Sequence, residues 1–278
     1  MADAEPITLA IKGSVATIVL KKPAITMPMA QALMKYMAAL NGPEHEAVRV
    51  IVLTGSSKYF CTGMDLNVAP SKNSKAAAGG VGDTSANKSF KPYALFEAIW
   101  GSPKPVVAVM NGPAMGGGVG LLYACDIRIA SDQSFIKFPE AALGIFPALI
   151  SGYISPQLGP YLTQSLMMTG EPMSAAELKS FGQVSAVCPP DRLQATTEQI
   201  VAKLLTAPKG SHAGVKRIIR TVSYQGEYHQ EAMDSLMSEF GGMMRSPEAR
   251  HGMKTFRAER KAPDWDEYYR QQATKSKL

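Results

Sequence analysis

Four glycines in five residues, at Gly116–Gly120, restrict the fold more than any other feature of the sequence. They follow an apolar run, Pro105–Met110, that predicts a buried strand, and they precede Leu121–Ala124, which predicts an apolar helix. Glycines at such a junction cost backbone entropy on folding. Either the helix must pack very closely on its neighbours, or a backbone N–H at the helix start must stay open to a ligand oxygen. The run alone leaves both explanations open.

The order of apolar patterns predicts an α/β core followed by a helical C-terminal segment. We place the core at residues 1–200 and the C-terminal helical segment, with a targeting tail, at residues 201–278. Strands are predicted at Ile7–Lys12, Val15–Leu20, Val48–Leu53, Pro105–Met110, Ile127–Ala130 and Ser134–Phe138. Helices are predicted at Pro28–Leu40, Tyr93–Trp100, Leu158–Met168, Ser174–Phe181, Asp191–Thr206, Gly214–Val222, Gln225–Met244 and from Pro247, with Ser246 as its cap. The segment Pro70–Lys91 has almost no large apolar residue and is predicted to be a surface loop.

Composition excludes several classes of protein. The chain of 278 residues is 46% hydrophobic and 19% charged, which is typical of a folded domain and not of a disordered one. Its net charge of +6 suits an anionic small ligand but is too weak to indicate nucleic acid. Three cysteines without a CxxC pair, and four histidines far apart in sequence, predict a reducing environment and no metal site. The charge-free stretches Pro105–Cys125 and Ala141–Gly170 contain prolines and polar residues, so we expect buried core and no membrane span.

The last three residues, Ser276-Lys277-Leu278, form a peroxisomal targeting tripeptide. A polar segment, Gln271–Lys275, precedes it and would leave it accessible to the import receptor. The sequence therefore predicts a peroxisomal protein with the import receptor as a partner.

Two further runs contain residues suited to chemistry. Phe60–Leu66 follows the strand Val48–Leu53 and contains Gly63 and Asp65, so it forms either an ordinary turn capped by Asp65 or a second turn with an open amide. Two such turns on adjacent strands would aim two N–H groups at one point, as in an oxyanion hole. Glu140 is the only charged residue between Lys137 and Glu171. It is either a surface carboxylate or a buried base with a raised pKa.

In this order and spacing, these runs resemble the crotonase family, the enoyl-CoA hydratase/isomerase superfamily. The resemblance covers nearly the whole chain and is carried by six segments, Phe60–Leu66, Lys104–Gly118, Cys125–Ser131, Pro139–Glu140, Leu143–Gly144 and Phe256–Trp265. It implies an α/β spiral of ββα units with a helical C-terminal trimerisation segment, assembled as a homotrimer or hexamer.

The resemblance also implies an acyl-CoA thioester as substrate, with no metal and no cofactor beyond the coenzyme A of that substrate. Glu140 would be the catalytic base, and the amides of Met64 and Gly117 would form the oxyanion hole. The implied substrate-binding residues are Cys61, Gly63, Asp65, Leu66, Gly116, Gly118, Gly120, Pro139 and Leu143. Arg260 and Lys261 are candidates for binding the CoA phosphates, and the loop Pro70–Lys91 would flank the acyl pocket.

Hydratases of the family carry a second glutamate, and its position falls here on Gly120. A single remaining glutamate resembles the Δ3,Δ2-enoyl-CoA isomerases, so isomerisation of a fatty acyl-CoA is the activity that the sequence favours. The alternatives are a hydratase in which Glu97 supplies the second acid, another crotonase-type reaction, or a non-catalytic binding member of the fold. The last would require a basic helix for RNA, for which Lys216, Arg217 and Arg220 are the nearest feature, although we expect them to form a solvated helix face.

Overall fold

The computed structural model describes residues 5–56, 58–66, 91–223 and 229–275. The predicted loop Pro70–Lys91, except for its last residue, and the C-terminal tripeptide Ser276–Leu278 lie outside the described residues. The peroxisomal address therefore stays a prediction.

The main sheet has six strands in the order β1-β2-β3-β4-β6-β9. They are β1 (Ile7–Lys12), β2 (Val15–Leu20), β3 (Val50–Gly55), β4 (Val106–Met110), β6 (Ile127–Ser131) and β9 (Ala186–Cys188). A turn at Gly13-Ser14 joins β1 and β2 antiparallel, and every later pair in this sheet is parallel. Parallel strands covered on both faces are nearly continuous apolar runs, as β3 and β4 are.

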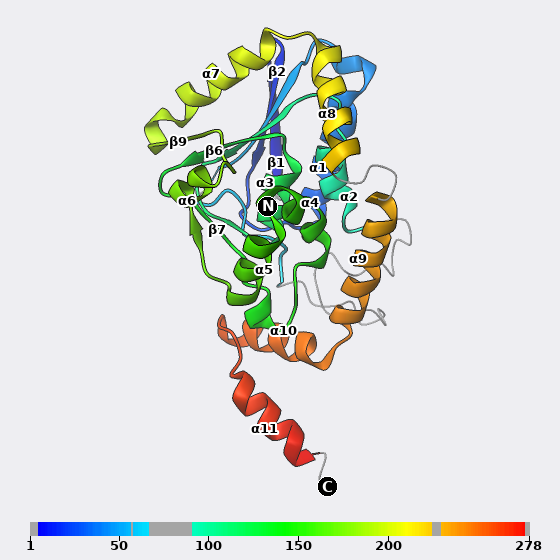
Figure 1. The fold of residues 1–278 in the computed structure, drawn as a ribbon, viewed down its shortest axis with the longest axis vertical. Coiled ribbons are helices and arrows are strands. Elements are labelled where there is room, and N and C mark those ends of the chain that lie inside the picture. The colour runs from blue at the N-terminus through cyan, green and yellow to red at the C-terminus, as the bar shows by residue number, and fades with distance from the viewer. Residues whose placement is uncertain (1–4, 57, 67–90, 224–228, 276–278) are drawn as a thin grey trace.

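Helices cover both faces of the main sheet (Figure 1). Alternate residues of β3 and β4 divide between two cores: Val52 and Val107 pack toward α7 (Leu193–Leu205), while Leu53 and Ala108 join the larger core. The larger core contains residues of α1 (Met27–Asn41), α2 (Ala94–Trp100), α3 (Gly117–Ala124) and α4 (Ala148–Leu158). The glycine-rich start of α3 is thus buried between a sheet and other helices.

A second, three-stranded sheet in the order β5-β7-β8 lies beside the first. Its strands are β5 (Ala114–Met115), β7 (Phe135–Lys137) and β8 (Met173–Ser174). The remaining elements of this part of the chain are η1 (Pro43–His45), η2 (Ala141–Leu143), α5 (Pro160–Thr169), α6 (Ala175–Ser180) and η3 (Pro190–Arg192). This small sheet positions the site described below.

The C-terminal part is helical, as predicted. It consists of α8 (Lys209–Ser223), α9 (His229–Met244), α10 (Pro247–Glu259) and α11 (Trp265–Lys275). The predicted cap of α10 is confirmed, since the N–H of Ala249 donates to the Ser246 hydroxyl at 3.0 Å. Figure 1 shows α10 at one end of the molecule and α11 projecting beyond it. Within the described ranges, no helix is long and apolar enough to cross a membrane, and no cluster of three or more potential metal ligands occurs.

Candidate active site

Three short chain segments run parallel and end at the same edge. The register pairs Ala114 with Ile136 and Met115 with Lys137, and an isolated parallel bridge pairs Cys61 with Ala114. The N–H of Met115 donates to the Cys61 carbonyl at 2.8 Å, and that of Gly116 to the Lys137 carbonyl at 3.0 Å. Because the carboxyl ends of parallel neighbours meet at one edge, the residues that follow these segments come together.

Those residues include the two amides expected to form an oxyanion hole, Met64 N–H and Gly117 N–H. Gly63 has a φ of +85°, and a Cβ on it would lie 3.0 Å from the Gly117 nitrogen, so the two turns are in direct contact. Gly117 is the first residue of α3, where helical N–H groups have no partner within the helix. Among the described residues, neither Met64 nor Gly117 donates its N–H to a protein acceptor.

Glu140 lies against the turn that precedes Gly117. A Cβ on Gly116, which has a φ of +49°, would come within 2.7 Å of the Glu140 carboxylate Oε1. The second oxygen, Oε2, is buried and has no hydrogen-bond partner in the described part of the chain. Burial raises the pKa of Glu140 to about 7, although a hydrogen bond with its own backbone opposes the shift. The carboxyl is therefore close to half-ionised near neutral pH.

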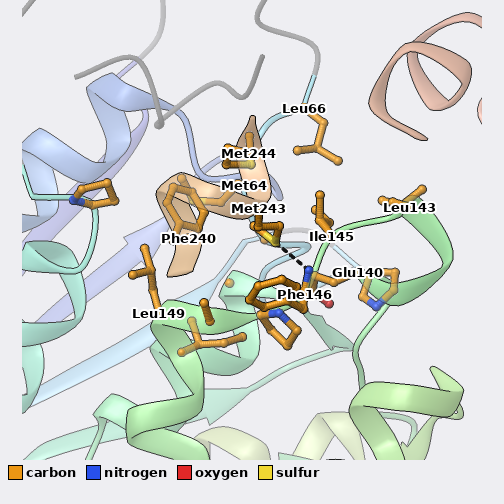
Figure 2. A pocket seen from close by; sticks show the side chains of 18 of the residues that line it. Met64, Leu66, Glu140, Leu143, Ile145, Phe146, Leu149, Phe240, Met243 and Met244 are labelled. Carbon is orange, nitrogen blue, oxygen red and sulfur yellow. Dashed lines mark hydrogen bonds between the residues drawn. The ribbon is translucent and has the colours of Figure 1, made fainter. Parts of the chain in front are cut away.

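A mostly apolar cavity of about 130 Å³ opens beside these groups. Of the described residues that line it, Glu140 is the only charged one. Figure 2 shows Met64, Phe240, Met243 and Met244 grouped on one side of the cavity that Glu140 also lines. The Phe146 N–H points to the Met243 sulfur at 2.8 Å and joins the site loop to α9. Unbranched thioether side chains adapt to ligands of different shape, so this wall suits a flexible apolar group.

Eight of the predicted site residues line the cavity and four do not. Those that line it are Gly63, Met64, Leu66, Gly116, Gly117, Pro139, Glu140 and Leu143. Cys61, Asp65, Gly118 and Gly120 are not among its lining residues. A Cβ on Gly118 would lie 2.1 Å from the carbonyl oxygen of the fully buried Cys61, so Gly118 permits the close approach of α3 to that segment. Asp65 does not line the cavity either, and its N–H donates to the Ile25 carbonyl at 3.0 Å.

The space beside Gly120 is filled by apolar side chains. A Cβ on Gly120 would meet Ile150 Cγ2 at 2.4 Å and Phe96 Cε1 at 2.9 Å. The position at which the resemblance places a second carboxylate therefore has neither a side chain nor room for one. Both explanations of the glycine run have support: Gly118 and Gly120 permit close packing, and Gly117 offers an open amide.

Glu97, the alternative second acid, does not line the cavity. Its carboxylate accepts a hydrogen bond from the Tyr153 hydroxyl. Tyr153 is fully buried in the core between α2 and α4. Glu97 thus belongs to a contact between helices and is not presented to a ligand in the cavity.

The basic residues of α8 differ from the expected solvated face. Lys216 is nearly buried, with its side chain 9% exposed, and its ammonium lies 2.6 Å from the Asp126 carboxylate. Arg220 lies over the Trp100 ring at 4.3 Å. Only Arg217 of the three is exposed. Arg260 and Lys261, the candidates for CoA phosphates, are exposed at the end of α10 and do not line the cavity.

The cavity wall contributed by the C-terminal helices was not anticipated from the sequence. It contains Phe240, Met243 and Met244 of α9 and Met253 of α10. Phe240, Met243 and Met244 are spaced at positions i, i+3 and i+4, which indicates one face of a helix. This spacing is the signal in the sequence that could have predicted the wall. That this face turns toward Glu140 is a tertiary relationship that the spacing does not contain.

The site brings two open backbone amides and one buried carboxyl to the edge of a mostly apolar cavity. The sequence model of the family described as Enoyl-CoA hydratase/isomerase matches residues 10–269. The chain belongs to this family and is a crotonase-type acyl-CoA enzyme. The predicted crotonase-type α/β fold with helices at the C-terminus is confirmed by the similarity to solved structures of the family.

Three similar proteins illustrate the range of the family. A protein of Alternaria alternata named as an enoyl-CoA hydratase is 32% identical over 248 residues, which cover 88% of this chain and 77% of that protein. A carnitinyl-CoA dehydratase of Salmonella typhi is 29% identical over 232 residues, which cover 82% of this chain and 85% of that one. The crystal structure of an enoyl-CoA hydratase/isomerase from Pseudoalteromonas atlantica is 25% identical, with a TM-score of 0.77, and the match covers 93% and 99% of the two chains.

Proposed function

We propose that the protein is a Δ3,Δ2-enoyl-CoA isomerase that uses Glu140 as its single acid–base group. The observation that carries the proposal is the filled space at Gly120, where Ile150 and Phe96 occupy the volume that a second carboxylate would need. Glu140 is then the one charged group available to the substrate among the described residues that line the cavity. Moving a proton between two carbons of the same substrate needs only one base.

In the proposed reaction, the thioester oxygen accepts hydrogen bonds from the N–H groups of Met64 and Gly117. Glu140 removes a proton from C2, the carbon next to the thioester carbonyl, and the electron pair delocalises into a dienolate. The same carboxyl then returns the proton to C4, and the double bond moves from C3–C4 to C2–C3. Each oxyanion donor contributes about 3 kcal/mol to lowering the barrier. A base with a pKa near 7 is suited to both proton transfers at neutral pH.

The acyl group that fits this cavity is neutral and apolar. Apart from Glu140, the described lining consists of apolar side chains, glycines and Thr62. A carboxylate or ammonium on the acyl chain would lose its hydration there without a charged partner, which is costly. We therefore propose an unsaturated fatty acyl-CoA as the substrate class, with the CoA moiety outside the apolar wall.

Hydration is the second candidate, because several similar proteins are named enoyl-CoA hydratases. Adding water to a double bond requires one group to activate the water and a group to deliver a proton. A hydratase would have to use Glu140 for both tasks, because Glu97 is held by Tyr153. The geometry therefore favours isomerisation.

The experiment that separates the two candidates is product analysis. The purified protein is incubated with 3-enoyl-CoA and 2-enoyl-CoA esters of several chain lengths, and the products are identified by chromatography and mass spectrometry. Conversion of 3-enoyl-CoA to 2-enoyl-CoA without a gain of about 18 mass units, the mass of one water molecule, supports isomerisation. A 3-hydroxyacyl-CoA product from 2-enoyl-CoA, with no isomerisation of 3-enoyl-CoA, contradicts it.

We also propose assembly as a homotrimer or hexamer. Large apolar side chains are exposed on two helices, with Tyr161 at 80% and Met168 at 70% on α5, and Val215, Ile218 and Ile219 exposed on α8. Exposed apolar side chains grouped in this way are typical of interaction surfaces. Light scattering coupled to size-exclusion chromatography tests the proposal, and a monomer at micromolar concentration contradicts it.

A further inference from the structure

The turn that carries Glu140 is held from outside by the C-terminal helices. Glu140 directly precedes η2, and its carbonyl accepts hydrogen bonds from Leu143 N–H at 2.9 Å and Ile145 N–H at 3.2 Å. A Cβ on Gly252 of α10 would lie only 1.7 Å from the Leu143 carbonyl oxygen, so α10 is in direct backbone contact with this turn. The position of the carboxylate thus depends on residues that follow it by more than a hundred positions in the chain.

Trp265, the first residue of α11, makes the most directional of these contacts. Its indole Nε1–H donates to the Ala142 carbonyl at 3.1 Å, two residues after Glu140. Its ring also lies where a side chain on Gly144 would project, because a Cβ there would meet Trp265 Cη2 at 2.6 Å. The indole therefore contacts η2 at Ala142 through one hydrogen bond and at the C-cap residue Gly144 through a packed ring edge.

Two other aromatic residues hold the indole in place. The Trp265 ring meets His251 at 5.7 Å and Tyr268 at 5.4 Å between centroids, both edge to face, and His251 stacks on Tyr268 at 4.6 Å. Aromatic clusters of this geometry gain energy beyond the burial of their surface. Because His251 lies on α10 and Tyr268 on α11, the cluster joins the two helices and fixes the direction of the Nε1–H.

We propose that Trp265 is a positioning residue for the catalytic carboxyl: it fixes the turn 140–145 so that the Glu140 carboxylate stays against Gly116 beside the two open amides. The inference rests on the proposed role of Glu140 as the base. It adds a function to the C-terminal helix, which completes the active site without lining the cavity.

The chain contains two tryptophans, which provide a matched pair of variants. Trp265→Phe keeps an aromatic ring on η2 and removes the N–H donor. Trp100→Phe makes the same change in a tryptophan that lies against Tyr153 and does not line the cavity. Displacement of a reacting group by about 1 Å can cost two orders of magnitude in rate, so loss of one of several restraints should slow proton transfer by about tenfold.

The readout is exchange of the C2 protons of butanoyl-CoA with deuterium in D2O, followed by NMR. This half-reaction needs the base and the oxyanion donors but no double bond, so it is informative even if the proposed isomerisation is not observed. We expect Trp265→Phe to slow exchange about tenfold at saturating ester with little change in Kd. Trp100→Phe should leave the rate constant close to that of the wild type.

A purely structural role for Trp265 predicts a different result. In that case Trp265→Phe lowers the unfolding temperature but leaves the exchange rate constant and its pH dependence unchanged, and this outcome overturns the proposal. A second measurement does not depend on turnover. It is the frequency of the infrared carbonyl band of protonated Glu140, which is identified because it is absent in Glu140→Gln. If the environment of the carboxyl depends on Trp265, the band shifts in Trp265→Phe, and an unchanged band contradicts the proposal.

Discussion

Ile150 fills the space that any side chain at Gly120 would occupy: a Cβ on Gly120 would lie 2.4 Å from Ile150 Cγ2 and 3.0 Å from its Cβ. These are atoms close to the backbone of α4, so the contact cannot be relieved by rotation of a flexible chain end. The absence of a carboxylate at this position is therefore built into the packing of α3 on α4. A single substitution cannot restore the two-carboxylate arrangement of the family's hydratases.

Gly120→Glu is accordingly expected to destabilise the protein and to create no hydratase activity. Overpacking costs about 1–3 kcal/mol, and a carboxylate buried without a partner adds to that cost. Urea unfolding measures the loss. Gly214→Ala is the matched control, since Gly214 lies in α8 and a Cβ on it would meet no atom within 4 Å, so it should be neutral or stabilising by up to about 1 kcal/mol. Hydration of crotonyl-CoA by a folded Gly120→Glu variant would contradict this expectation.

Glu140→Gln should reduce kcat by at least about 10²–10⁴-fold, because the amide cannot accept the proton. Acyl-CoA binding should remain nearly unchanged, since the amides of Met64 and Gly117 and the apolar wall are intact. Calorimetry measures binding and a coupled assay measures turnover. Glu171→Gln, a change at an exposed glutamate, is the control. Full activity of Glu140→Gln would remove Glu140 from the mechanism.

The raised pKa of Glu140 predicts a specific pH dependence. A base must be deprotonated to act, so kcat/KM should rise with pH through about 7 and then level off. The pKa in the folded state lies above the ordinary value of 4.5, so the folded state binds the proton more tightly than the unfolded state. The resulting stability is fully present below about pH 4.5 and is lost as the pH rises through about 7.

Glu140→Gln removes this loss of stability at high pH, because the glutamine side chain stays neutral at every pH. The variant should be more stable than the wild type at alkaline pH, by at most about 3 kcal/mol, and this advantage should disappear in acid. Urea unfolding at several pH values provides the comparison. A stability difference that does not change with pH would show that Glu140 titrates as an ordinary surface carboxyl.

Gly117→Pro tests one oxyanion donor directly. Proline is tolerated at the first position of a helix, which Gly117 occupies in α3, and it removes the N–H. The expected loss in kcat is about 10²–10³-fold. Gly117→Ala keeps the N–H, and its Cβ would make only ordinary contacts of 3.5 Å or more, so it should retain most of the activity. Equal activity of the proline and alanine variants would exclude the Gly117 amide from the reaction.

The sequence predicts most of the sheet correctly because strands buried on both faces appear as continuous apolar runs. It predicts neither α4 nor α11, for opposite reasons. Helix α4 is buried almost all round, contains Pro156 and carries no charge, so it lacks the alternation between apolar and polar faces. Helix α11 is mostly polar, and its contact with the body depends largely on Trp265 and Tyr268.

The main-chain part of the candidate site is predictable, but its walls are not. Met64, Gly117 and Glu140 follow three segments whose parallel pairing brings them to one edge, and short motifs identify such turns. Ile150 beside Gly120, and the methionines of α9 beside Glu140, reach their places through packing between distant elements. No local pattern encodes those contacts, so the sequence identifies the missing carboxylate but not what replaces it.

The two open amides belong to the backbone, so every residue except proline at positions 64 and 117 supplies an N–H group. The groups proposed for catalysis and the side chains proposed to contact the acyl chain therefore lie in different parts of this molecule. The proposed proton transfer depends on chain geometry and one acid, whereas α9 and α10 contribute Phe240, Met243, Met244 and Met253 to the wall that would contact the acyl chain. Under the proposed function, changes in that wall are expected to alter the preferred acyl chain while Glu140 and the two amides stay in place.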